Sequence, residues 1–317
     1  MKTITVAIIT KQRAKKLVRC IKSLQHQDAH PDQIVIIDTA ETDELKNRVA
    51  KLGSITRIIY AHLPKASVAE ARNFALDSTK TNLLCFVDDD CIVSKKYIGS
   101  ALDYFDRQTI PKKTAYIVGA SKIYKNPSYA ALAEYIYSNY WYEKKIQENL
   151  PFLTPFNFDT KNVVLNLDTF KRNKVKFPKK FQLKSFDSSD TAVGFILDSL
   201  GLRGEQIKHL ILWHDDGVNT LQLLTKQFYK GVIATKIAKR WHQSHEFVDL
   251  YFSLRKCMAW GNEYKGYLQA DVYQPFISLK NILIFIIIKL RIWSFTAGYW
   301  LATKHPKLIE KLEGSYF

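Results

Sequence analysis

Three consecutive carboxylates close an apolar run near residue 90. Residues 82–87 read NLLCFV, the composition of a buried strand, and Asp88, Asp89 and Asp90 follow at once. Adjacent acids repel one another, so a folded protein keeps them together mainly where a cation or an extended partner compensates their charge. A solvated acidic turn at the end of a strand is the alternative, and the trio alone favours neither.

Other apolar runs of strand length also end in polar side chains. Residues 4–10 end at Thr10, and the next run, residues 33–37, is followed by Asp38. Strand-like and helical patterns alternate along this part of the chain, which predicts a doubly wound, mostly parallel sheet flanked by helices. The carboxyl ends of such strands share one edge, so we expect Thr10, Asp38 and the acidic trio to border one crevice. The expected helices cover residues 13–25, 44–52 and 67–78.

Two further polar residues stand at predicted element ends. Asp190 precedes an expected helix at residues 192–200 that Gly201 ends. An aspartate at a helix start can act as a base or simply cap the helix. His214 follows a short strand-like run, residues 210–213. It can complete a metal site or serve a structural role.

Composition narrows the class of partner. The chain has 317 residues, a formal net charge of +17 and 47% apolar residues, which suits a large folded domain with an anionic partner. It has no zinc-finger spacing, glycine-rich phosphate loop or basic low-complexity tail, so nucleic acid is disfavoured relative to a nucleotide or a membrane surface. Four cysteines without paired spacing are expected to be small core residues in a reducing compartment: Cys20, Cys85, Cys91 and Cys257.

The chain start does not have the pattern of a signal peptide. Its apolar run is short, meets Lys11 and Arg13, and lacks a small-residue cleavage site. We therefore expect a cytoplasmic protein.

The last third of the chain is basic and apolar. An expected helix at residues 221–242 precedes a strongly apolar stretch at 277–302, which Lys280, Lys289 and Arg291 interrupt. An in-plane membrane helix is favoured. A buried helix of a second domain or a dimer interface also fits, and a transmembrane helix is the least favoured. A further helix, residues 129–146, carries aromatic rings that could stack on a ligand, meet a membrane interface or pack on the sheet: Tyr135, Tyr137, Tyr140, Trp141 and Tyr142.

Four segments together resemble one known family. These are residues 8–13 (IITKQR), 36–43 (IIDTAETD, similar to "VDDGSTD"), 69–73 (AEARN) and 86–90 (FVDDD, similar to an Asp-x-Asp motif). In this order they resemble the family 2 glycosyltransferases, whose fold is GT-A, a Rossmann-like, mostly parallel central sheet flanked by helices. The resemblance extends from residue 4 to about 225. It implies a transferase domain at 1–220 and a helical extension at 221–317 that could associate with a membrane.

The resemblance also implies roles for particular residues. Asp88, Asp90 and His214 would hold Mg²⁺ or Mn²⁺, and Asp190 would be the general base of an inverting transfer. The donor would be a nucleotide sugar, with a UDP-sugar favoured, and the acceptor a hydroxyl of a glycan or of a lipid-linked molecule. The remaining residues of the implied nucleotide site are Thr10, Arg13, Asp38, Arg72 and Asp89.

Three departures from the family pattern keep an alternative open. Gln12, Thr39 and Ser189 replace residues that the family usually has. A catalytically inactive, membrane-attached protein that binds nucleotide sugars or glycans would tolerate them. A nucleotidyltransferase is a third option, which Asp190 at a helix start makes less attractive. For this protein we expect peripheral contact with the inner face of the cell membrane.

Overall fold

The computed structural model describes residues 2–53, 55–107, 113–147, 158–183, 186–241 and 279–307, with the backbone alone at 139–147. Its chain forms two compact units that are interleaved along the sequence. The first comprises Met1–Tyr124, Pro151–Lys179 and Ser189–Asp215; the second comprises Lys125–Leu150, Lys180–Ser188 and Asp216–Phe317. The division expected at residue 220 stays a prediction.

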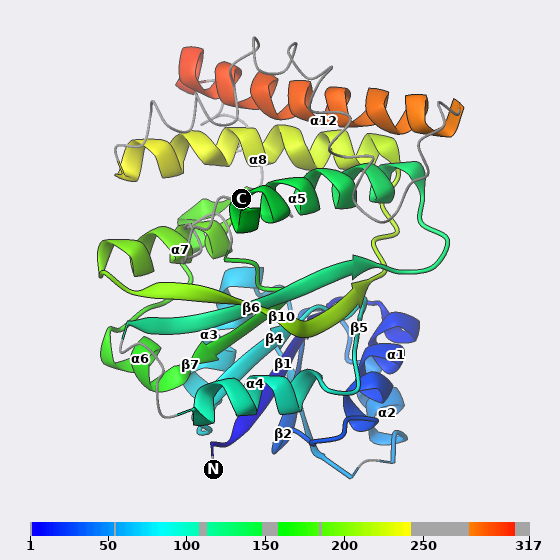
Figure 1. Cartoon of the computed structure of the whole chain (residues 1–317), viewed down its shortest axis with the longest axis vertical. Helices are drawn as coiled ribbons and strands as arrows, with labels where there is room; N and C mark the ends of the chain where they lie inside the picture. Colours follow the sequence, from blue (N-terminus) through cyan, green and yellow to red (C-terminus); the bar gives the residue numbers. More distant parts are fainter. Residues whose placement is uncertain are drawn as a thin grey trace. The chain divides into compact units, whose positions relative to one another are not determined.

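The first unit is built on a sheet of eight strands (Figure 1). Their order is β3-β2-β1-β4-β7-β6-β10-β5, and β7 and β5 run antiparallel to their neighbours while the other pairs are parallel. This is the mostly parallel sheet that the sequence predicts. The strands are β1 (Ile4–Thr10), β2 (Gln33–Asp38), β3 (Arg57–His62), β4 (Leu83–Val87), β5 (Cys91–Val93), β6 (Thr114–Ile123), β7 (Asn162–Asn166) and β10 (Arg203–His214).

Helices α1 (Ala14–Gln25), α2 (Leu45–Ala50) and α4 (Tyr97–Asp106) pack with the strands in one hydrophobic core. Apolar residues at helical spacing in α1 share this core with the alternate residues Ile4, Val6 and Ile8 of β1. The central strands have few exposed positions, as expected where helices cover both faces of a parallel sheet.

The remaining helices of this unit are α3 (Val68–Ser78), α6 (Leu167–Arg172) and α7 (Ser189–Ser199). The start of α3 is fixed by a capping box, in which Ser67 Oγ accepts from the Glu70 amide and the Glu70 carboxylate accepts from the Ser67 amide. Phe86 of β4 packs edge-on against Phe177, with ring centroids 5.7 Å apart. The capping box fixes the start of α3, the helix that carries Arg72.

Strand pairing brings the polar strand ends together. Thr10 pairs with Asp38 at the ends of β1 and β2, and Asp38 pairs with His62 at the end of β3. At the other side, β10 pairs antiparallel with β5 so that His214 lies opposite Cys91. The crevice edge expected from the sequence therefore carries side chains from strands that are far apart along the chain.

The second unit contains three long helices, α5 (Tyr129–Gln147), α8 (Thr220–Trp241) and α12 (Leu279–Lys304). In Figure 1, α8 and α12 run alongside each other. Each carries a glycine at the crossing: a Cβ on Gly231 would lie 2.1 Å from the carbonyl oxygen of Phe295, and one on Gly298 would lie 2.1 Å from that of Phe228. Only glycine permits so close an approach of the two backbones.

An ion pair joins α12 to α5. Arg291 forms a close salt bridge with Glu134, and its guanidinium lies over the ring of Tyr137 at 3.7 Å from the centroid. The amide of Gln227 on α8 lies 3.3 Å from the same carboxylate. Arg291, one of the charges that interrupt the apolar C-terminal stretch, is therefore explained by its contacts with the neighbouring helix α5. The side chains of Tyr140, Trp141 and Tyr142 lie outside the described residues, as does Cys257.

Candidate active site

The acidic trio occupies the turn between β4 and β5. The amide of Cys91 donates to the carbonyl of Asp88 at 3.0 Å, which closes the turn. Asp89 and Asp90 are only 3% and 6% exposed, whereas Asp88 is partly exposed. The trio is therefore not a solvated acidic turn, and its carboxylates need compensation from the protein or from a ligand.

Asp89 is compensated by the protein itself. Thr10 Oγ1 donates to Asp89 Oδ2 at 2.7 Å, and Arg13 Nη1 donates to Oδ1 at 3.2 Å. Burial raises the pKa of Asp89 to about 6, although the Thr10 hydrogen bond and the Arg13 charge oppose the shift. Asp89 thus ties the acidic turn to the end of β1 and the start of α1.

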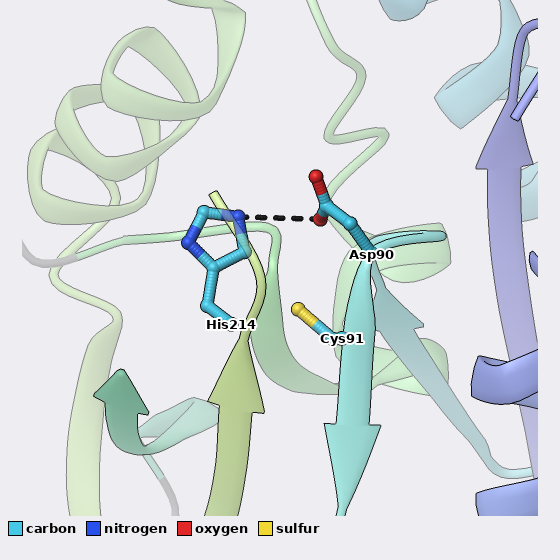
Figure 2. A group of neighbouring side chains, drawn as sticks. All are labelled: Asp90, Cys91 and His214. Atoms are coloured by element: carbon cyan, nitrogen blue, oxygen red, sulfur yellow. Dashed lines mark ion pairs between the residues drawn. The ribbon is translucent and has the colours of Figure 1, made fainter. Parts of the chain in front are cut away.

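Asp90 faces two basic side chains. Arg13 Nη1 donates to Oδ2 at 2.9 Å, and His214 Nε2 lies 3.2 Å from Oδ1 (Figure 2). Burial favours the protonated carboxyl, but the imidazole of His214 and the charge of Arg13 outweigh it and lower the pKa of Asp90. The carboxylate form is therefore the stable one.

The turn fits a divalent cation. Oδ1 of Asp90 is buried and receives no hydrogen bond of standard geometry from the part of the chain that the structure describes. Loss of hydration, followed by the negative charge of Asp90, raises the pKa of Asp88, so the Asp88 carboxylate is short of positive charge. Ligand atoms of Asp90, Cys91 and His214 all lie within 4.8 Å of one another. Carboxylate oxygens and imidazole nitrogen are ligands that bind Mn²⁺ and Mg²⁺ in proteins.

Asp38 lies fully buried at the end of β2. Its Oδ2 accepts from the Tyr60 hydroxyl at 2.6 Å, and its Oδ1 accepts from the amide of Ala40 at 2.9 Å. Burial and the Asp38 carboxylate raise the pKa of Tyr60. Tyr60 was not singled out from the sequence, because its partner is fixed only by the pairing of β2 with β3.

Arg72 and Ser189 link α3 to α7. Arg72 is 8% exposed, and its Nη1 donates to Ser189 Oγ at 3.1 Å, while its guanidinium lies 5.4 Å from the ring centroid of Phe177. Its charge also acts on Asp88, favouring the carboxylate form. The serine that replaces a family glutamate therefore contacts the expected pocket arginine.

Asp190 stands in the first turn of α7, which begins at Ser189 rather than at residue 192 as expected. The expected start was three residues late, because the Ser-Asp-Thr run was interpreted as preceding the helix. Asp190 is partly exposed, and its Oδ1 accepts from the amide of Thr191 at 2.7 Å. A helix N-terminus favours the anionic carboxylate that a base requires.

The structure adds residues that the sequence analysis missed. Lys161, in an ion pair with Asp159, lies near enough to Asp88 for their charges to interact. Asp215 binds Lys16 and Arg19 of α1. No local pattern could indicate that Lys161 lies near Asp88 or that Asp215 binds α1, because these partners are distant along the chain.

Solved structures with the same fold support the architecture. A mannosyltransferase from Pyrobaculum calidifontis, solved in complex with GDP-Man and Mn²⁺, shares 15% sequence identity at a TM-score of 0.61, over 98% of this chain and 88% of that one. Residues 1–349 of S. aureus TarS with UDP give 15% identity and a TM-score of 0.52, over 95% and 91% of the two chains. The same protein with UDP-GlcNAc gives 14% identity and 0.51, over 95% and 92%. Comparison with curated protein sequences gives no match.

The sequence itself carries the assignment to a family. Residues 5–166, about half of the chain, match the profile described as Glycosyl transferase family 2. The matched segment includes the acidic turn, Arg13, Asp38 and Arg72, and the sheet is the GT-A sheet that the resemblance implied. The chain therefore belongs to glycosyl transferase family 2 and is a glycosyltransferase.

Proposed function

We propose that the protein transfers a sugar from a nucleotide-sugar donor to a hydroxyl of a glycan or a lipid-linked acceptor, with inversion at the anomeric carbon. The observation that carries this proposal is the buried carboxylate of Asp90 facing His214 at the crevice edge, with Asp88 in the same turn. The nucleotide ligands of the similar structures, GDP-Man, UDP and UDP-GlcNAc, support a nucleotide-sugar donor. We favour a UDP-sugar.

Asp88, Asp90 and His214 would hold a divalent cation, Mg²⁺ or Mn²⁺. When bound, such a cation neutralises charge on the diphosphate leaving group. The Mn²⁺ in the mannosyltransferase structure from Pyrobaculum calidifontis supports this choice. Arg13 can add to the same neutralisation: both of its bonds to the trio come from Nη1, and its side chain is 56% exposed, so the guanidinium can also face a phosphate. Thr10, Asp38, Asp89 and Arg72 would border the nucleotide.

Asp190 is proposed as the general base. In a single displacement the acceptor oxygen forms a bond to the anomeric carbon as the bond to the diphosphate oxygen breaks, and the acceptor proton passes to the Asp190 carboxylate. A positioned base of this kind accelerates a reaction by about 100- to 10,000-fold. The partial exposure of Asp190 at the start of α7 is consistent with access to an acceptor hydroxyl.

The base assignment can be tested with two variants on one helix. Asp190→Asn should reduce transfer by about 100-fold or more and leave nucleotide affinity unchanged. Asp198→Asn, an exposed aspartate in the last turns of the same helix, is the matched control. Transfer by Asp190→Asn at the rate of the control would rule out the base. Nucleotide binding without transfer in the wild-type protein would favour the inactive binding protein instead.

The exposed face of α12 suggests where the protein meets a membrane. Leu279, Ile286, Trp293 and Trp300 are exposed apolar residues at seven-residue spacing, and both tryptophans are 56% exposed. Positions seven apart lie on one side of a helix. The helix has no acidic residue, and by length and composition it could cross a membrane. We propose that this face lies in the interface of the cytoplasmic leaflet, where tryptophan is favoured and anionic lipids attract lysine.

Vesicle flotation tests the membrane proposal. The protein should float with vesicles that contain an anionic lipid and bind less to zwitterionic ones. The pair Trp293→Ala and Trp300→Ala should lose binding, while Leu200→Ala, an exposed apolar residue of the first unit, should not. Equal flotation of all variants would contradict the proposal. A wild-type dimer that dissociates in the double tryptophan variant would instead assign the face to a second copy of the chain.

A further inference from the structure

Cys91 brings a thiol to the edge of the cation site. Cys91 begins β5 directly after Asp90, and the pairing of β5 with β10 places it opposite His214. Residues directly opposite each other in an antiparallel pair project to the same face. In Figure 2 the sulfur lies below the line that joins the imidazole to the carboxylate, and the three ligand atoms lie within 4.8 Å of one another.

The other buried thiols have different surroundings. Cys20 Sγ lies 3.5 Å from the carbonyl oxygen of Asp88, a main-chain group on the acidic turn. Cys85 Sγ lies 3.8 Å from the Tyr97 hydroxyl and 3.9 Å from the carbonyl of Phe86. Within the described ranges, Cys91 alone among the cysteines joins a carboxylate and an imidazole in such a cluster.

A carboxylate, a thiolate and an imidazole are softer ligands than the two carboxylates and the imidazole proposed to hold Mg²⁺ or Mn²⁺. Mg²⁺ and Mn²⁺ prefer oxygen ligands, whereas Zn²⁺ accepts sulfur and nitrogen. Zinc sites with three protein ligands and one position open to solvent are known from catalytic zinc centres. Zn²⁺ also binds most protein sites more tightly than Mn²⁺ does. Asp90 Oδ1, which is buried and lacks a hydrogen bond of standard geometry among the described residues, points toward this cluster.

We propose that Asp90, Cys91 and His214 form a thiolate-containing site that binds a thiophilic divalent cation such as Zn²⁺ in the nucleotide-free protein. Binding displaces the thiol proton of Cys91 to solvent and forms a metal–sulfur bond. This site shares Asp90 and His214 with the hard-cation site, so the two cations exclude each other. Zinc therefore inhibits the transfer in competition with Mn²⁺, a consequence that rests on the proposed function, whereas the binding itself does not.

Cobalt titration tests the site without any activity measurement. Co²⁺ added to the full chain without nucleotide should produce a thiolate-to-cobalt charge-transfer band in the near ultraviolet that saturates at a single ion per chain. Zn²⁺ should abolish the band by displacement. Cys91→Ser should remove it, His214→Ala should weaken cobalt binding about 10-fold or more, and the control Cys85→Ser should keep it.

Three results would overturn the site: a wild-type protein without the band, a band that persists in Cys91→Ser, or a band lost equally in Cys85→Ser. Circular dichroism of each variant shows whether it is folded, and Cys91→Ala provides a second thiol-free variant should Cys91→Ser misfold. In transfer assays, excess Mn²⁺ should relieve zinc inhibition of the wild type. If no transfer is detected, the cobalt band still decides the metal site.

Discussion

The main-chain amide of Asp215 donates a hydrogen bond to the main-chain carbonyl of Asp90 at 3.0 Å. Through this bond the residue after His214 is attached to the backbone of Asp90, whose carboxylate His214 faces. Helix α1 holds the same residue from the other side: Arg19 Nη2 donates to its carboxylate at 2.5 Å, and Lys16 Nζ donates to its carbonyl at 2.6 Å. Asp215 is therefore placed to fix the distance between His214 and Asp90.

Asp215→Ala should weaken Mn²⁺ binding in the presence of nucleotide by about 10-fold, because loss of an outer-shell partner misplaces a ligand. Calorimetry measures the affinity, and Asp216→Ala is the neighbouring control. If Asp215 acts through His214, its replacement should cost little further affinity in a His214→Ala background. The same loss in both backgrounds would show that Asp215 contributes independently of His214.

The sequence predicted the strands and helices of the first unit well, because most are short apolar runs between clear turn signals. Residues 4–10 were expected as a strand and form β1. The strand expected at 210–213 is longer, since β10 begins at Arg203 and includes the mostly polar residues 203–209 and an irregularity between Ile207 and Ile211. Apolar content could not reveal a strand segment whose side chains are largely polar. The three-residue β5 was also too short to be recognised.

The candidate site was predictable in part. Family motifs indicated Asp88, Asp90 and His214, but the contact of Asp90 with His214 depends on the pairing of β5 with β10. Such pairings join segments more than a hundred residues apart, and local patterns carry no information about them. The same limit applies to Cys91 and Asp215, whereas Tyr60 meets Asp38, 22 residues earlier, through the pairing of β2 with β3.

The ion pair between Glu134 and Arg291 should be essential to the second unit. Both side chains are largely buried, so Glu134→Gln leaves an uncompensated guanidinium among three helices. Removing one partner of a buried pair costs about 3–5 kcal/mol, and denaturant unfolding should show a loss of this order. Glu41→Gln, at an exposed position, is the control. The double variant Glu134→Leu with Arg291→Met should be more stable than Glu134→Leu alone. A less stable double variant would contradict the explanation that the loss comes from an unpaired buried charge.

The same pair predicts a dependence of stability on pH. Burial alone favours neutral Glu134, but the charge and hydrogen bonds of Arg291 outweigh it and lower the pKa of Glu134 in the folded protein. A carboxyl with a lowered folded pKa contributes stability above its unfolded pKa, about 4.3, and loses that contribution as the pH falls. Unfolding between about pH 5 and pH 3 should therefore show a steeper loss of stability for wild type than for Glu134→Gln. Parallel curves would exclude Glu134 as a source of acid sensitivity.

The crossing of α8 and α12 should not tolerate a side chain at Gly298. A Cβ there would lie 2.1 Å from the carbonyl oxygen of Phe228, so the helices must separate. Gly298→Ala should destabilise the protein by about 1–3 kcal/mol, measured by denaturant unfolding. At Gly53 a Cβ would meet nothing within 4 Å, so Gly53→Ala should have little effect and serves as the control. Equal stability of the two variants would mean that the crossing adjusts without cost.

Tyr60 should connect the buried Asp38 to nucleotide binding. Tyr60→Phe removes the hydroxyl that donates to Asp38 Oδ2 at 2.6 Å and leaves a buried carboxylate oxygen without that bond. A loss of about 1–3 kcal/mol in the free energy of unfolding is expected. If Asp38 borders the nucleotide, UDP or GDP affinity should also fall, about 10-fold for each 1.4 kcal/mol of lost binding energy. Calorimetry with both nucleotides measures this and indicates which base the pocket prefers.

The control for that experiment is Tyr129→Phe, an exposed tyrosine of the second unit. Cobalt binding without nucleotide should be unchanged in Tyr60→Phe, because Tyr60 lies in β3 and Asp38 ends β2. The proposed cobalt ligands lie elsewhere on the sheet, at the start of β5 and the end of β10. A variant that loses stability but binds UDP and GDP as the wild type does would show that Asp38 anchors the strand ends without lining the nucleotide pocket. A variant that loses nucleotide affinity while the control does not would place Asp38 at that pocket and leave the cation site independent of it.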